Sequence, residues 1–177
     1  MAQIKRNKKF TQTKLSYLPK EIYNFFFLAF TLLFALSIIS HDPSDPNFFK
    51  TGLGNTINNY IGIFGSYISH ITFMVFGKTS YFLTALLIYL ALQKYRILIA
   101  NEKSLSFKNI SLIVILLFSL SMISEYILAG SGGYLGHISF YHLSNYIGTY
   151  GSLLASVMCL IYSFTYYFDI SVSNTLN

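Results

Sequence analysis

Long apolar runs that are almost free of charge are the feature that most limits what this chain can fold into. They lie near residues 22–40, 61–92, 109–128 and 151–168. A transmembrane helix needs about 20 mainly apolar residues. Only 10% of the 177 residues are charged, against about 25% in a typical soluble domain, so too few charges remain to cover a soluble surface. The sequence therefore predicts an all-α integral membrane protein.

One motif occurs twice. Asn59–Ser66 reads N-Y-I-G-I-F-G-S, and Asn145–Ser152 reads N-Y-I-G-T-Y-G-S. Each copy follows an apolar run and a polar loop, and each leads into another apolar run. This pattern predicts two similar halves, each with an apolar segment out, a loop, a G-x-x-G entry and an apolar segment back. A chance match in a chain rich in Asn, Ile, Tyr and Gly is the alternative.

The placement of basic residues predicts the orientation of the first span. Half of the twelve Lys and Arg residues precede it, namely Lys5, Arg6, Lys8, Lys9, Lys14 and Lys20. Such clusters stay on the cytoplasmic side, and no A-x-A-like cleavage site follows the apolar run. We expect residues 1–21 to form a basic, poorly ordered cytoplasmic tail before an uncleaved anchor. We expect no direct nucleic-acid binding, because that needs more than a charge run.

The apolar stretch 61–92 is too long for one span, and Gly77-Lys78-Thr79 interrupts it. If it crossed the membrane twice, four basic residues would lie outside, against the positive-inside rule: Lys94, Arg96, Lys103 and Lys108. We therefore favour an interfacial or re-entrant helix on the outer side, followed by one span. The sequence leaves open whether residues 61–76 span, dip into or lie on the membrane.

The predicted membrane domain covers residues 22–168 and has both termini in the cytoplasm. It is a bundle of four transmembrane helices with the interfacial or re-entrant helix added, and its spans lie at about 22–40, 73–92, 109–128 and 151–168. Residues 169–177 form a short cytoplasmic tail.

The sequence predicts no catalytic, cofactor or metal site. Gly77-Lys78-Thr79-Ser80 resembles the end of a phosphate-binding loop, but Thr72 stands where the motif needs its first glycine. All four histidines fall on the outer side without metal-ligand spacing: His41, His70, His137 and His142. No Ser–His–Asp or Cys–His arrangement is visible.

Four other polar or reactive residues have structural interpretations. Glu125 is the only acidic residue within an apolar run, and we favour an interfacial position over a proton relay because no partner lies at matching depth in another span. Asp42 and Asp45 each directly precede a proline, as turn-forming residues often do. Cys159 is expected to be a small buried side chain.

Small residues at helical spacing predict close helix packing, because membrane helices approach one another through them. The helix-packing or interaction residues that we predict are Asn59, Gly62, Gly65, Gly77, Gly132, Gly133, Gly136, Gly148 and Gly151.

Several of these segments together resemble the N-terminal four-helix membrane domain of the FtsK family of bacterial DNA translocases. The resemblance extends from about Ile22 to Phe168. Its strongest pieces are Ser40-His41-Asp42-Pro43-Ser44-Asp45-Pro46 and the segment from Asn59 to Phe76-Gly77; Gly132–Gly136 and Ile147–Leu154 also match. Ser66, His70 and Thr84 depart mildly from the family pattern.

The resemblance implies a membrane anchor at the division septum of the bacterial inner membrane, acting in cell division and chromosome segregation. It implies the lipid bilayer, further copies of the chain, other division proteins and a motor region or separate motor chain as partners. The family's ATPase motor and DNA-reading domain are absent from these 177 residues, so no enzymatic activity is expected of them. A small transporter or channel subunit is the alternative.

Overall fold

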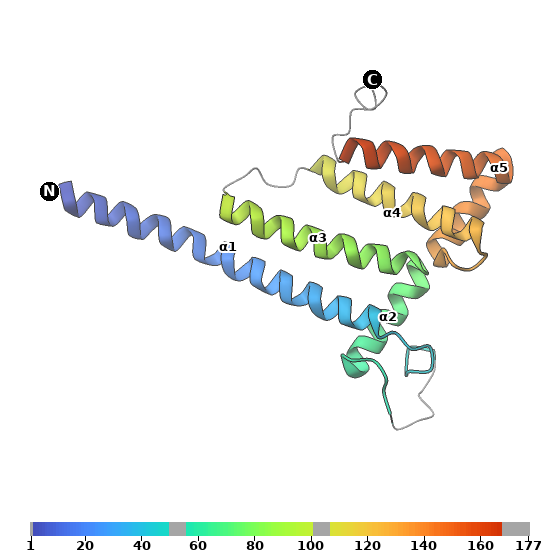
Figure 1. The fold of residues 1–177 in the computed structure, drawn as a ribbon, viewed down its shortest axis with the longest axis horizontal. Coiled ribbons are helices and arrows are strands. Elements are labelled where there is room, and N and C mark those ends of the chain that lie inside the picture. The colour runs from blue at the N-terminus through green and yellow to red at the C-terminus, as the bar shows by residue number, and fades with distance from the viewer. Residues whose placement is uncertain (1, 50–55, 101–106, 168–177) are drawn as a thin grey trace, which may run out of the picture.

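The computed structural model describes residues 2–49, 56–100 and 107–167, and every regular element in these ranges is a helix. The helices are α1 (Ala2–Ile39), α2 (Gly62–Phe76), α3 (Thr79–Ala100), α4 (Phe107–Ile127) and α5 (Gly133–Tyr167). Figure 1 shows α1, α3, α4 and most of α5 running side by side, with the short α2 crossing one end. The predicted all-α membrane bundle with an additional short helix is confirmed.

The helices pack as two pairs. The main contacts join α1 to α3 and α4 to α5, while α2 touches α1, α3 and α5. Much of the buried surface is small and polar, including Ser152, Ser156 and Ser163 on α5. In contrast, the large side chains of Phe25, Phe26, Leu33 and Met158 are more than half exposed. This distribution suits a lipid environment, where small residues line the helix contacts and apolar residues face outward.

The helix α1 begins at Ala2, so the basic segment at the start of the chain is helical and continues into the first apolar helix, as Figure 1 shows. The expectation that Cys159 is buried is wrong, because this residue is exposed on α5. An outward-facing thiol on a membrane helix contacts lipid at little cost, because it behaves as a small apolar group.

Residues 73–92, predicted to form one span, are not one straight helix. α2 ends at Phe76, and α3 starts at Thr79 after a turn of 112°. Gly77 adopts φ 57° and ψ −139°, a conformation that is almost restricted to glycine and that ends the helix. Residues 73–76 therefore belong to the crossing helix, and the helix of this region begins six residues later than predicted.

By length and composition, two helical segments in the described ranges suffice to cross a membrane, Glu21–Ile39 and Gly133–Tyr167. The bent pair Gly62–Phe76 with Thr79–Tyr95 adds a third if it is counted as one broken span. Ser111–Ile127 is a shorter apolar helix. The assignment of spans to residues 22–40, 109–128 and 151–168 stays a prediction, and residues 168–177 lie outside the described ranges.

Glycines with positive φ occupy equivalent positions in two similar halves of the chain. α5 bends at Gly148 (φ 73°, ψ 168°), so it consists of helices 133–147 and 149–167. Gly133 follows Gly62 at the same sequence separation as Gly148 follows Gly77, and all four have positive φ. Each half is thus a long helix, a loop, a short helix that begins at one glycine, and a long helix that follows the next.

The register that the sequence motif predicts for these halves is wrong. Asn59–Ser66 enters the short helix α2, whereas Asn145–Ser152 spans the bend within α5. In both copies the motif supplies a positive-φ glycine before a helix, but it starts the short helix once and the last long helix once. The structural counterpart of Gly62-x-x-Gly65 is Gly133-x-x-Gly136.

Candidate functional site

Two polar junctions, one in each half, gather at the end of the bundle where α1 and α4 finish and α3 begins. We call the first the aspartate junction and define it by Asp42, Asp45, Asn58 and Asn59. The second is the glutamate junction, defined by Glu125, Gly130, Gly132 and His137. Both lie at the end of the bundle that is drawn on the right in Figure 1.

In the aspartate junction, Asp45 fixes the chain ahead of α2. Its carboxylate is buried and accepts hydrogen bonds from the backbone amides of Asn58 (2.8 Å) and Asn59 (2.9 Å). The prolines after Asp42 and Asp45 have no N–H for a backbone ladder, and the acceptor of the Asn58 and Asn59 amides is the Asp45 side chain. Asp45 is therefore more than the simple turn former predicted from sequence.

Asn59 joins this loop to α1. Its side-chain amide donates to the carbonyl oxygens of Ser37 (2.9 Å) and Ser40 (3.3 Å), and its Oδ1 accepts from the amide of Ile61 (3.1 Å). Gly65 lies directly against it, and a Cβ at Gly65 would overlap Asn59 Oδ1. The Ser37 hydroxyl donates to the Gly65 carbonyl (2.6 Å). The start of α2 and the end of α1 are therefore joined by hydrogen bonds from side chains of one segment to backbone carbonyls of the other.

Asp42 and His41 lie at the exposed edge of the aspartate junction. Hydrogen bonds from the Ser44 hydroxyl, the Ser44 amide and the Asn58 side chain lower the pKa of Asp42 to about 2. Burial lowers the pKa of His41, whose Nδ1 lies 3.0 Å from Ser69 Oγ. At neutral pH this edge therefore carries an ionised carboxylate beside a neutral imidazole.

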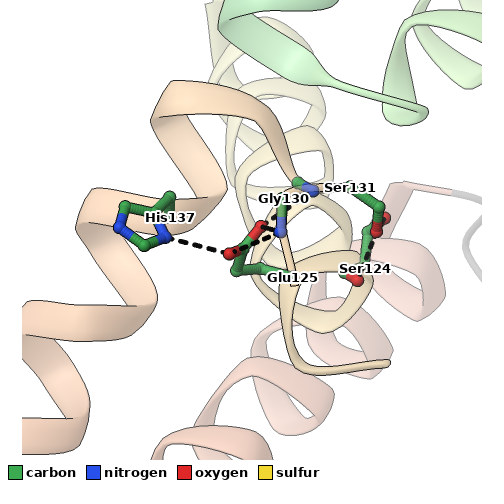
Figure 2. Close-up of polar contacts among 6 residues, drawn as sticks. Ser124, Glu125, Gly130, Ser131 and His137 are labelled. Carbon is green, nitrogen blue, oxygen red and sulfur yellow. Dashed lines mark hydrogen bonds and ion pairs between the residues drawn. The ribbon is translucent and has the colours of Figure 1, made fainter. Parts of the chain in front are cut away.

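In the glutamate junction, the Glu125 carboxylate holds the loop after α4. Gly130 donates its amide to both carboxylate oxygens (2.9 and 3.0 Å), and Gly132 donates to Oε2 (3.0 Å). His137 Nδ1, from the start of α5, lies 2.9 Å from Oε1, as Figure 2 shows. Glu125 is 6% exposed, so a buried charge is compensated here by backbone amides and one partly exposed imidazole.

The loop held by Glu125 also joins the two halves. The Lys78 amide donates to the Ser131 carbonyl (2.8 Å), and the Ser131 hydroxyl bonds to the Ser124 side chain (2.8 Å). Gly77 and Gly133 meet backbone to backbone, so a Cβ on either would overlap the other segment. The turn between α2 and α3 therefore rests directly on the loop between α4 and α5.

The predicted packing residues are not all in equivalent places. Backbone or side-chain atoms crowd Gly65, Gly77, Gly132, Gly133 and Gly136, and Asn59 is buried. Gly62 and Gly148 have open space where a Cβ would stand, and Gly151 approaches only Ile147, on the other side of the bend within α5. A role of these nine residues in contacts with partner chains stays a prediction.

Sequence reasoning missed the partner of Glu125. The sequence shows no basic partner for Glu125 at matching depth in another span, and this favours an isolated interfacial carboxylate. The structure contradicts that isolation, because His137 at the start of α5 is the partner of Glu125. The available signal was the loop composition, because Gly130, Gly132 and Gly133 follow closely after Glu125. Successive glycine amides can turn toward one carboxylate.

The chemistry of both junctions is that of structural anchoring. Within residues 2–49, 56–100 and 107–167, no group of three His, Cys, Asp or Glu side chains could hold a metal ion. The acidic side chains of Asp45 and Glu125 bind backbone amides of neighbouring loops, so they fix the path of the chain between helices.

Comparison with known families agrees with this architecture. Searches of curated proteins and of solved structures each found no significant match. The family described as the 4TM region of DNA translocase FtsK/SpoIIIE matches residues 16–177, which is nearly the whole chain. With its apolar helices, the match makes this a multi-pass membrane protein, and the chain belongs to the family formed by the 4TM region of the DNA translocases FtsK and SpoIIIE.

Proposed function

We propose that this chain anchors an FtsK-type DNA translocase in the bacterial inner membrane at the division septum, where it acts in cell division and chromosome segregation. The observation that carries the proposal is the family match over residues 16–177. The two junctions support it, because they tie the helices into one unit through loops rather than through a reactive centre.

In this proposal the chain has no enzymatic role of its own. Its partners are the lipid bilayer, further copies of the chain, other division proteins, and a motor region or separate motor chain that acts on DNA. The chain itself makes no direct contact with nucleic acid. An anchor needs no phosphate-binding loop, and Thr72 rules out that motif at Gly77-Lys78-Thr79.

A fluorescent protein fused after Asn177 and imaged in dividing cells tests the proposal. We expect a bright band at midcell, with the fluorophore matured in the cytoplasm. The control is the same fluorescent protein on an unrelated multi-pass membrane protein at equal expression. An even envelope signal that matches the control would contradict the septal role, and a dark but fully expressed fusion would contradict the cytoplasmic C-terminus.

A transporter or channel subunit is the second candidate, because the Glu125 carboxylate of α4 and the His137 imidazole of α5 lie within hydrogen-bond distance of each other. The other hydrogen bonds of the Glu125 carboxylate come from the backbone amides of Gly130 and Gly132. The discriminating variant is Glu125→Gln, assayed for ion flux in proteoliposomes and for midcell localisation. Flux that the native chain supports and Glu125→Gln abolishes would favour the transporter.

A further inference from the structure

The short helix α2 buries its polar side and exposes its apolar side. Its buried residues are Gly65, Ser66, Ser69 and Thr72. The hydroxyls of the last three all have acceptors within the chain, at the carbonyls of Pro46, Ser66 and Ile68 respectively. This face is therefore fully satisfied by the protein and needs no water.

The opposite face of α2 is apolar and uncovered. Ile63, Phe64, Ile71 and Met74 fall within a stripe about 100° wide on a helix of 3.6 residues per turn, and each is exposed, Phe64 by 69%. The buried set occupies the other side of the helix. A helix in water shows the reverse arrangement, so the exposed stripe identifies a face that is not meant for water.

Two aromatic residues of the preceding loop extend this stripe. Phe48 packs edge-on against Tyr67 with the ring centroids 4.6 Å apart, and Phe49 lies 6.0 Å from His70. Phe49 is nevertheless 74% exposed. From Ile57 to Gly77 the sequence has no Lys, Arg, Asp or Glu. We call this continuous surface of α2 and Phe48–Phe49 the outer apolar face.

The angle between α2 and α3 sets the depth of this face. For α3 along the bilayer normal, a turn of 112° places α2 about 20° from the membrane plane, so α2 does not span. Because the turn exceeds a right angle, the Gly62 end of α2 is the deeper end. With a rise of 1.5 Å per residue, Phe64 lies about 6 Å deeper than Met74.

We propose that the outer apolar face inserts into the outer leaflet of the bilayer, with α2 as a tilted interfacial helix whose start dips below the headgroups. Lipid is the occupant because the chain is a multi-pass membrane protein and because α2 packs against α1, a helix that also exposes large apolar side chains. Coverage by a protein partner instead of lipid is an outcome that the experiment below distinguishes. The proposal is independent of the septal role.

The absence of tryptophan from the chain makes a direct test practical. The variants Phe64→Trp, Met74→Trp and Phe49→Trp each introduce one fluorophore with a mild change of size. Each full chain is reconstituted at a low protein-to-lipid ratio in vesicles whose phosphatidylcholine carries bromine either near the glycerol or near the chain end. Phe30→Trp, on the exposed face in the middle of the first apolar helix, is the deep control, and circular dichroism verifies helix content.

We expect blue-shifted emission from the three test variants and stronger quenching by the shallow bromines, whereas the order is reversed for Phe30→Trp. Phe64→Trp should be quenched more than Met74→Trp by the deep bromines. Emission typical of water would overturn the proposal. Blue-shifted emission that no bromolipid quenches would also overturn it, because it would show that a second copy or another protein covers the face. Strongest quenching by the deep bromines at all test positions would mean that α2 spans.

Discussion

The two halves of this molecule follow the same backbone plan and differ in the surface that their short helices present. The exposed face of α2 carries Ile63, Phe64, Ile71 and Met74, whereas the exposed face of segment 133–147 carries Tyr134, His137, Tyr141, His142 and Asn145. One face is aliphatic and aromatic, and the other combines tyrosine with hydrogen-bonding groups. Tyrosine and histidine suit the wet boundary of a membrane or a protein partner.

The junctions that position the two short helices differ as well. In the first half the anchoring carboxylate, Asp45, belongs to the loop and binds amides just ahead of α2. In the second half the carboxylate, Glu125, belongs to the long helix α4 and binds amides of the following loop. The comparison teaches that one turn geometry can be held from either side, which is why the sequences of the junctions share so little.

The largest effect is expected from a side chain placed where the halves meet. In Gly133→Ala, the new Cβ would overlap the backbone of Val75, Phe76 and Gly77, and φ is +65°. Overpacking and left-handed strain together predict a loss of about 4 kcal/mol in the free energy of unfolding. Unfolding in mixed micelles, followed by circular dichroism, measures it.

The matched control is the equivalent position in the first half. Gly62 has φ +68° but open space around its Cβ position, so Gly62→Ala should cost only the backbone strain of about 1 kcal/mol. Equal losses for the two variants would show that the close approach of Gly77 and Gly133 adds no cost beyond the backbone strain.

The next largest effect is expected at Glu125. Glu125→Ala leaves the amides of Gly130 and Gly132 without their acceptor in a buried site, which should lower the free energy of unfolding by about 3 kcal/mol. His137→Ala is the control, because that side chain is 66% exposed and its loss should cost about 1 kcal/mol or less. A loss for His137→Ala as large as that for Glu125→Ala would mean that Glu125 stabilises the fold through its contact with His137 and not through the loop amides.

A smaller effect is expected at Asn59 in the aspartate junction. Asn59→Ala removes the donors to Ser37 and Ser40 and the acceptor for Ile61, although Asp45 still holds the loop. We expect the free energy of unfolding to fall by about 2 kcal/mol, since the two bonds to α1 and the local bond to Ile61 disappear. Hydrogen exchange of the α2 amides should rise more than that of segment 133–147. Uniformly increased exchange in both short helices would contradict the separate roles of the two junctions.

The sequence predicted the apolar helices well because their signal is local. Runs near residues 22–40 and 109–128 are long and uncharged, so both ends of α4 and the C-terminal end of α1 could be placed within a few residues, whereas the start of α1 at Ala2 could not. The placement of Gly77 as a break in the apolar run 61–92 was also visible. The start of α3 at Thr79 was not, because the apolar character of 73–76 continues without a change across the turn.

The candidate site was less accessible, because its residues are joined by backbone contacts that composition does not encode. The carboxylate of Asp45 binds amides more than ten residues away, and nothing in Asn58 or Asn59 as residue types specifies it. Glu125 and His137 are joined by a loop whose path depends on positive φ at Gly130 and Gly133. The repeated motif was real as a local turn signal, but only the positions of such glycines revealed the register of the two halves.

The smallest effect is a pH dependence at the exposed edge of the aspartate junction. The folded pKa of Asp42, about 2, lies below its ordinary value of 3.8. A depressed carboxyl pKa contributes stability that is fully present above about pH 4 and is lost as the pH falls toward 2. The native chain should therefore lose more stability than Asp42→Asn over this window. Because Asp42 is exposed, the difference in stability between the two chains should be small.

Unfolding midpoints in micelles, measured between pH 5 and 2, test this prediction. The curves of the native chain and of Asp42→Asn should converge at the acidic end. Parallel curves would mean that the bonds from Ser44 and Asn58 do not hold the carboxylate in the folded protein.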